Sequence, residues 1–287
     1  MAHERQAGSR NRSAGWHSMR VFLVGNGSKP DAQPVFKSLQ ASLPAVCDVV
    51  GDSLDPDYAE AASSGPDLIA VVGGDGTLIA VARGTVGSEI PLAGVNAGKL
   101  GFLAEFTEQE IIDTIRAGVL LSPRSLSERM MLDVKLLRGG ELEFRSPAAN
   151  DCVVRDPRAM LRLSVCLDGE HLTNMGSDGV IVCTPSGSTA YNLAAGGPLL
   201  QPGVDAMVLT PICPHGLTFR SLAVEASRTV TICPESACDL IIDGQPPVRA
   251  LGGDTVKVSR HHSTFLLVHN TSHAPWHAMR TKLHWGQ

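Results

Sequence analysis

A change of sequence pattern near residue 122 constrains the fold more than any other feature of this chain. Before it, short apolar runs alternate with helical segments, which predicts a mostly parallel sheet with helices on its faces. The expected strands and helices of this half are 20–25, 31–43, 45–50, 57–64, 67–72, 77–86 and 91–95. After it, apolar and polar residues alternate at short spacing between turn residues, which predicts antiparallel β structure.

Specific turn and cap residues support both halves. Gly139-Gly140 and Asp168-Gly169 each separate two alternating runs, which is a hairpin signature. Thr107 and Glu110 form a capping box that predicts the start of a helix, and Gly118 predicts its end. Further strands are expected at 229–234, 238–243, 254–260 and 263–270.

The fold class predicted is therefore α/β plus β. We expect an N-terminal α/β domain at 19–124 and a C-terminal β-sandwich-like domain at 125–270. The polar, arginine-rich residues 1–18 are expected to be a disordered tail or the product of an early start codon before Met19. An organellar presequence is the alternative for this stretch.

Composition excludes several classes of protein. A net charge of −5 gives no reason to expect nucleic acid or an anionic membrane as a partner. No apolar run reaches the roughly 18–20 residues of a spanning helix. The seven cysteines include no C-x-x-C pair, which favours reduced thiols in a cytoplasmic protein over disulfides or a zinc site.

The loop Gly-Gly-Asp-Gly-Thr at 73–77 is the first candidate site. It joins an apolar strand to a helix, and ligands of open α/β sheets bind where strands end. Its glycines allow close approach of a ligand, and its N–H groups can cradle phosphate. Asp75 would repel phosphate unless it does chemistry or holds a metal. The alternative is a tight turn with Asp75 as a local cap.

Other phosphate-binding signatures are missing from the sequence. No G-x-x-x-x-G-K-[ST] motif occurs, and Pro30 replaces the third glycine of a dinucleotide fingerprint in 25–30. The segment 25–30 is therefore interpreted as a turn.

Two polar segments in the second half are further candidates. Ser186, Ser188 and Thr189 follow a strand and can line a polar ligand site, although an ordinary capped helix would also explain them. Asn150-Asp151 opens another strand, and a turn is its alternative. No G-x-S-x-G elbow supports a nucleophilic serine.

Together these motifs resemble the NAD kinase family, bacterial type. The resemblance covers residues 20–285 and includes GVNAGKLGFLAEF, AGGPLLQP, DGQ at 243–245 and NTSHAPWHAMRTKLHW. The loop at 73–77 alone is less specific, because phosphofructokinases and lipid kinases share it. A diacylglycerol- or sphingosine-type lipid kinase and a non-catalytic nucleotide-binding regulator therefore stay as alternatives.

The resemblance implies transfer of the γ-phosphoryl group of ATP, or of polyphosphate, to the 2′-hydroxyl of the adenosine ribose of NAD. Asp75 is then the expected general base. Because the loop has no lysine, Mg²⁺ is expected to neutralise the phosphate charge. No metal site on the protein itself is expected. The expected NAD-binding residues are Asp75, Gly76, Phe102, Asn150, Asp151, Gly176, Asp178, Ser186, Thr189, Ala190, Tyr191, Ala194 and Gln245. The expected phosphate- or ATP-binding residues are Gly73, Gly74, Gly76 and Thr77.

The family architecture places the active site between the two domains, with the tail 271–287 returning to the first. Members assemble as homodimers or homotetramers. This chain has Asp151 where the family most often has glutamate. Gly176 stands where some members carry arginine, and a glycine there tends to accompany acceptance of NADH as well as NAD.

Overall fold

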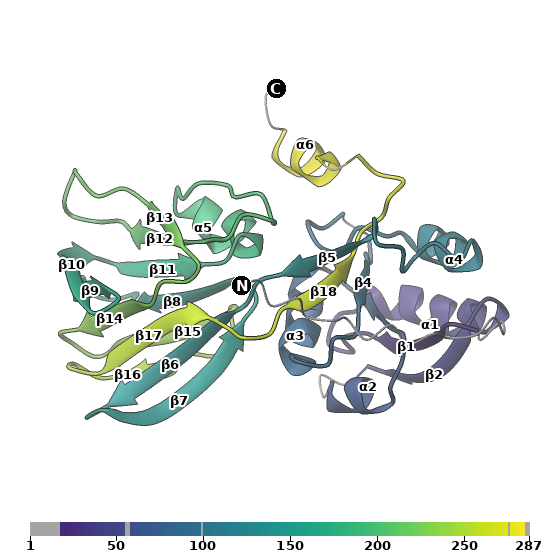
Figure 1. The fold of residues 1–287 in the computed structure, drawn as a ribbon, viewed down its shortest axis with the longest axis horizontal. Helices are drawn as coiled ribbons and strands as arrows, with labels where there is room; N and C mark the ends of the chain where they lie inside the picture. Colours follow the sequence, from purple (N-terminus) through teal and green to yellow (C-terminus); the bar gives the residue numbers. More distant parts are fainter. Residues whose placement is uncertain (1–17, 55–57, 99, 275, 285–287) are drawn as a thin grey trace, which may run out of the picture.

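The computed structural model describes residues 18–54, 58–98, 100–274 and 276–284. An α/β region and an all-β region lie side by side in it, and the C-terminal helix stands apart from both (Figure 1). The elements of the α/β region are β1 (Arg20–Val24), α1 (Ala32–Ser42), the 3₁₀ turn η1 (Leu43–Ala45), β2 (Asp48–Ser53), α2 (Ala59–Ser63), β3 (Leu68–Val72), α3 (Asp75–Gly84), β4 (Leu92–Val95) and α4 (Glu108–Arg116). The expected tail at 1–18 lies almost wholly outside the described residues.

Helices cover both faces of the first sheet, because alternate strand residues point to opposite sides. Val21 and Leu23 of β1 pack in a cluster with residues of α1 and α4. Phe22 and Val24 pack in a second cluster with residues of α2 and α3. The strands are therefore buried on both faces, which explains their continuous apolar runs.

The first sheet has the order β2-β1-β3-β4-β18-β5, and β1 to β4 are parallel. Its last two strands are β5 (Leu126–Arg129) and β18 (Phe265–Val268). β18 pairs parallel to β4, and β5 pairs antiparallel to β18. Both segments were expected in the C-terminal domain, and this assignment was wrong for them. Periodicity reveals a strand but not which sheet it joins.

The second region consists of two six-stranded sheets, with the orders β10-β9-β14-β17-β6-β7 and β13-β12-β11-β8-β15-β16. Residues of both sheets, such as Val134 and Val182, share one apolar core, so the sheets face each other. The strands are β6 (Leu132–Arg138), β7 (Glu141–Ala148), β8 (Asp151–Arg155), β9 (Leu161–Leu167), β10 (Glu170–Ser177), β11 (Gly179–Cys183), β12 (Ala206–Ile212), β13 (Leu222–Glu225), β14 (Val230–Pro234), β15 (Cys238–Ile242), β16 (Val248–Ala250) and β17 (Thr255–Arg260). The α/β plus β fold class is confirmed.

Both expected hairpins are present. Gly139 and Gly140, between β6 and β7, have φ of +57° and +89°. Asp168 and Gly169, between β9 and β10, have φ of +52° and +84°. Two successive positive φ angles match the twist of the flanking strands, which is why glycine and aspartate occur there.

Two helix ends follow the sequence signals closely. α4 has the reciprocal capping box of Thr107 and Glu110, and Gly118 follows it with φ of +68°. α3 starts at Asp75, two residues before the expected position, because Gly74 is its extended N-terminal cap. The described helices include none that is long and apolar enough to cross a membrane.

We expect Thr107→Ala to destabilise the protein by about 1 kcal/mol, because the N–H of Glu110 would lose its capping acceptor. A thermal melt should show a Tm lower by roughly 2–4 °C. Thr107→Ser is the control, since it keeps the hydroxyl. A serine variant that melts as low as the alanine variant would contradict the capping role.

Candidate active site

The loop at 73–77 has the geometry expected of a ligand cradle. Gly73 has φ of +152°, and a Cβ there would lie 2.6 Å from the Thr77 hydroxyl oxygen. A Cβ at Gly74 or Gly76 would meet nothing within 4 Å. Gly73 is thus required by the turn itself, whereas the other two glycines leave open space beside the backbone.

Asp75 is held by a second loop and does not act as a local cap. Its Oδ2 accepts the N–H of Phe102 at 2.9 Å, and its Oδ1 accepts those of Leu103 and Ala104 at 3.0 and 3.1 Å. A Cβ at Gly101 would lie 2.0 Å from Oδ1. The loop 101–104 is therefore fitted around the carboxylate, and the turn-and-cap alternative is wrong.

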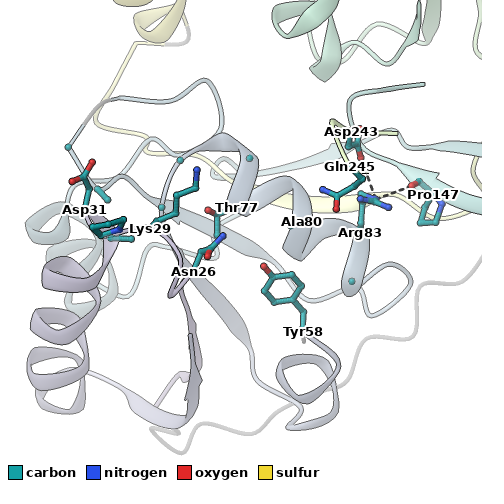
Figure 2. Close-up of a pocket in the computed structure, with 18 residues that line it drawn as sticks. Asn26, Lys29, Asp31, Tyr58, Thr77, Ala80, Arg83, Pro147, Asp243 and Gln245 are labelled. Carbon is teal, nitrogen blue, oxygen red and sulfur yellow. Dashed lines mark hydrogen bonds and ion pairs between the residues drawn. The ribbon is translucent and has the colours of Figure 1, made fainter. Parts of the chain in front are cut away.

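A cavity of about 1160 Å³ opens beside the glycine loop (Figure 2). Gly73, Gly74, Gly76 and Thr77, which were predicted to bind phosphate or ATP, line it. Gln245, which was expected to bind NAD, also lines this cavity. Its other walls include Asn26, Lys29, Pro30, Asp31, Tyr58, Arg83, Pro147 and Asp243.

Lys29 and Arg83 are two cations of this wall that the sequence did not reveal. The segment 25–30 forms the turn that was expected, with the N–H of Lys29 donating to Asn26. That turn also brings Lys29 to the cavity. Arg83 comes from the far end of α3, where its Nε donates to the Pro147 carbonyl at 3.2 Å. Neither residue belongs to a recognisable motif.

A buried carboxyl pair links the cavity to the second region. Asp243 accepts the N–H groups of Ala149, Asn150 and Asp151 at 2.8, 2.8 and 3.0 Å, and its Oδ2 lies 3.6 Å from Arg83 Nε. Burial raises the pKa of Asp243 despite these partners. Burial, followed by repulsion from Asp243, raises the pKa of Asp151 to about 7.

A second cavity has a volume of about 610 Å³. Phe102, Ser186 and Thr189 line it, and so does the C-terminal segment, including Trp276. Gly74 and Gly76 line the first cavity, whereas Phe102 and Leu103, which bind Asp75, line the second. Asp75 lines neither cavity itself, but it links residues that line the first to residues that line the second.

A buried arginine adds an unexpected polar group to the second cavity. Arg129 is 4% exposed. Burial lowers its pKa to about 10, although the negative charge of Glu105 acts to raise it. It donates to Ser186 Oγ at 3.4 Å and to His269 Nε2 at 3.0 Å, so His269 Nδ1 donates to Glu105 at 2.8 Å. Arg129 Nε has no partner in the described part of the chain.

The hydroxyl run at 186–189 is only partly available to a ligand. It forms a 3₁₀ turn, η2 (Ser186–Thr189), followed by the short helix α5 (Tyr191–Ala194). Ser188 is fully buried and its Oγ bonds the backbone of Pro185 and Leu200, so it does not line a cavity.

Asn150 Oδ1 is buried without a partner among the described residues, which leaves an acceptor for a ligand donor.

The remaining expected NAD-binding residues do not all meet at Asp75. Asp178 and Tyr191 line a third cavity, of about 380 Å³, together with Met160. A Cβ at Gly176 would lie 3.2 Å from Met160 Sδ. Ala190 and Ala194 lie on the segment of η2 and α5, where Ala190 immediately precedes the helix.

Comparison with known proteins identifies the family. The family model described as the ATP-NAD kinase N-terminal domain matches residues 30–119, and that of the ATP-NAD kinase C-terminal domain matches residues 150–270. An NAD kinase of Geotalea daltonii is 41% identical over 273 residues, covering 93% of this chain and 91% of its own. One of Syntrophotalea carbinolica is 41% identical over 226 residues, covering 77% and 79%.

The chain belongs to the NAD kinase family. The activity of this family is phosphorylation of NAD to NADP, a phosphoryl transfer to an alcohol. The family membership rejects the lipid-kinase alternative, because the acceptor is NAD.

Two solved structures share the fold. Yeast NADH kinase in complex with NADH has a TM-score of 0.78 at 24% identity and covers 94% of this chain and 89% of its own. An NAD kinase from Archaeoglobus fulgidus in complex with ATP has a TM-score of 0.70 at 22% identity and covers 93% and 98%.

The raised pKa of Asp151 predicts a pH-dependent loss of stability. An unfolded Asp151 loses its proton near the ordinary value of 3.8, whereas the folded one loses it near 7. Between these values the folded chain binds more protons, so stability falls as pH rises from about 4 to about 7 and then stays constant. The full loss corresponds to about 4 kcal/mol.

Asp151→Asn cannot ionise, so its Tm should exceed that of the wild type by more at pH 8 than at pH 5. We expect a gain of roughly 5 °C or more at pH 8. Thermal melts of both proteins at the two pH values measure this. An equal Tm difference between the two proteins at pH 5 and at pH 8 would show that Asp151 does not titrate as inferred.

Proposed function

We propose that this NAD kinase transfers the γ-phosphoryl group of ATP to the 2′-hydroxyl of the adenosine ribose of NAD, with Asp75 as the general base. The observation that carries this proposal is that Asp75 follows Gly74 of the first cavity and binds Phe102 and Leu103 of the second. A donor bound on one side and an acceptor on the other would meet at this carboxylate. Positioning of this kind supplies most of the catalysis of phosphoryl transfer.

The first cavity suits a triphosphate. The backbone of Gly74 and Gly76 at the start of α3 offers N–H donors and the positive end of the helix dipole. Lys29 and Arg83 add positive charge from two further sides (Figure 2). The complex of the Archaeoglobus fulgidus NAD kinase with ATP supports ATP as the donor. Polyphosphate offers the same phosphate chemistry and is the alternative donor.

Mg²⁺ would be held mainly by the donor. The described residues contain no group of three His, Cys, Asp or Glu side chains that could hold a metal ion. Phosphate oxygens and water are the usual ligands of Mg²⁺ in kinases, so the nucleotide would bring the ion with it. When bound, the ion neutralises phosphate charge.

The second cavity suits the adenosine part of NAD. Phe102 offers a ring for stacking, and Ser186 and Thr189 offer hydroxyl groups. The complex of yeast NADH kinase with NADH supports a pyridine dinucleotide as the acceptor. Met160 packs closely against Gly176, since a Cβ there would lie 3.2 Å from its Sδ. Acceptance of NADH as well as NAD stays a prediction.

Assembly and location complete the proposal. Leu172 of the edge strand β10 and Leu222 of the edge strand β13 are 43% and 41% exposed, and Leu217 is 93% exposed. Apolar side chains on sheet edges favour contact between copies of the chain, so we propose a homodimer or homotetramer. The reduced state of seven cysteines suits the cytoplasm. We also propose that the tail 271–287 returns to the N-terminal domain.

Asp75→Asn tests the base. The amide fills the same space and can still accept the N–H groups of Leu103 and Ala104, but it cannot take a proton. We expect kcat to fall about 10²–10⁴-fold. NADP formed from NAD, ATP and Mg²⁺ is read through an NADP-specific dehydrogenase.

Binding of NAD to the Asp75→Asn variant is the control for folding, and it should be retained. A variant that keeps at least about half of the wild-type kcat would contradict the assignment of Asp75 as the general base. A wild-type protein that binds NAD and forms no NADP would instead favour the non-catalytic regulator.

Lys29→Met tests the donor side. Loss of a charged hydrogen bond to phosphate should raise KM for ATP about tenfold. KM for NAD should stay within about twofold, because Lys29 lines the first cavity and not the second. Lys37→Met, an exposed change on α1 with the same loss of charge, is the matched control. Equal effects of the two variants on KM for ATP would show only a general effect of charge.

A further inference from the structure

The C-terminal helix brings a lysine to the base. α6 (His277–Leu283) stands apart from both sheets (Figure 1). Residues at its start, including His277 and Met279, line the second cavity. Farther along the helix, Lys282 Nζ lies 3.7 Å from Asp75 Oδ2. The same ammonium lies 4.4 Å from the centre of the Phe102 ring.

The hydrogen bonds of Asp75 leave one position for a further partner. Oδ1 accepts two backbone N–H groups and Oδ2 accepts one. Each carboxylate oxygen has about two acceptor sites, so one site on Oδ2 stays open for the substrate hydroxyl. Lys282 is on this side of the carboxylate, at a distance beyond that of a direct hydrogen bond. Its charge is therefore close to the base without occupying the last acceptor site.

Two contacts hold the ammonium in this place. The carboxylate of Asp75 attracts it by its opposite charge, and the ring of Phe102 attracts it through its π-face. The N–H of Phe102 in turn binds Asp75, so one residue positions both the base and the cation. The side chain of Lys282 is 32% exposed and that of Asp75 is 28% exposed, so both can reach a ligand.

We propose that Lys282 supplies the cation that binds the phosphoryl group during its transfer. This inference rests on the proposed function. In the transfer, the oxygen of the 2′-hydroxyl bonds to the γ-phosphorus while the bond from that phosphorus to the β–γ bridging oxygen breaks. The bridging electron pair leaves with ADP, and the hydroxyl proton goes to Asp75. Lys282 forms no covalent bond and stays protonated.

Geometry favours this role over that of a structural ion pair. The hydroxyl that gives its proton to Oδ2 lies within hydrogen-bond distance of it, and the phosphoryl group is attached to the same oxygen. An ammonium 3.7 Å from Oδ2 is therefore next to the equatorial phosphoryl oxygens, where negative charge is spread in the transition state. The glycine loop itself contains no lysine, so the tail supplies the missing charge.

Kinetics of Lys282→Met test the proposal. We expect kcat to fall about 10²–10³-fold, as for loss of one charge-stabilising donor, with KM for NAD changed by less than about threefold. The kcat of Lys282→Arg should be at least about tenfold higher than that of Lys282→Met, because arginine keeps the charge. Arg280→Met removes the same charge from an exposed position of the same helix and should leave kcat unchanged.

Binding provides a second readout without turnover. NADP carries the transferred phosphate on its 2′-oxygen, so Lys282→Met should weaken NADP binding about tenfold and leave NAD binding unchanged, as measured by calorimetry. Loss of binding to both dinucleotides would mean that α6 has only a structural role and would overturn the proposal.

Other outcomes also decide the matter. An increase in kcat for Lys282→Met would show that the lysine blocks the base, and an unchanged kcat would show that it is idle; either result overturns the proposal. Failure of the wild type to form NADP would contradict the proposed function itself. If Lys282→Met does not fold, Lys282→Gln and Lys282→Arg are compared in the same two assays, and equal activity of the two overturns the proposal.

Discussion

The carboxylate of Asp75, held by three backbone N–H groups, is the interaction on which the site depends. It fixes the loop 101–104 against the start of α3 and so shapes the wall between the two cavities. Gly101 is required there because any side chain would strike the carboxylate. The proposed base is thus fixed before the substrates bind and needs no rearrangement during the reaction, which is where electrostatic catalysis gains most.

A second carboxylate, which unlike Asp75 is buried, has a similar role in the β-rich region. Asp243 binds three successive backbone N–H groups at the start of β8 and lies near Arg83 of α3. The contact therefore joins the β-rich region to α3 of the α/β region. It also places a negative charge beside Asp151, and burial of that pair is what raises the pKa of Asp151. The buried Asp243 therefore both positions the backbone at residues 149–151 and contributes to the raised pKa of Asp151.

The charges of the site come from parts of the chain that are far apart. Lys29 follows β1, Arg83 ends α3, and Lys282 belongs to α6. P-loop kinases place their lysine within the phosphate loop, next to the glycines. Here the loop has room for a ligand and a base but no cation. Under the proposed function, the phosphate charge is met by the surrounding structure and by the Mg²⁺ proposed to arrive with the nucleotide.

The sequence by itself determined the features that neighbouring residues encode. The hairpin turns, the capping box of α4 and the glycine loop after β3 all rest on local dihedral and hydrogen-bond preferences. Periodicity also predicted the α/β and β halves.

Only the tertiary structure decided which distant segments meet. It paired β18 with β4, turned Ser188 inward, and brought Phe102 and Lys282 to Asp75. The physical reason is that such contacts depend on the pairing order of the strands and on the path of the chain between them, and no pattern of adjacent residues specifies either one.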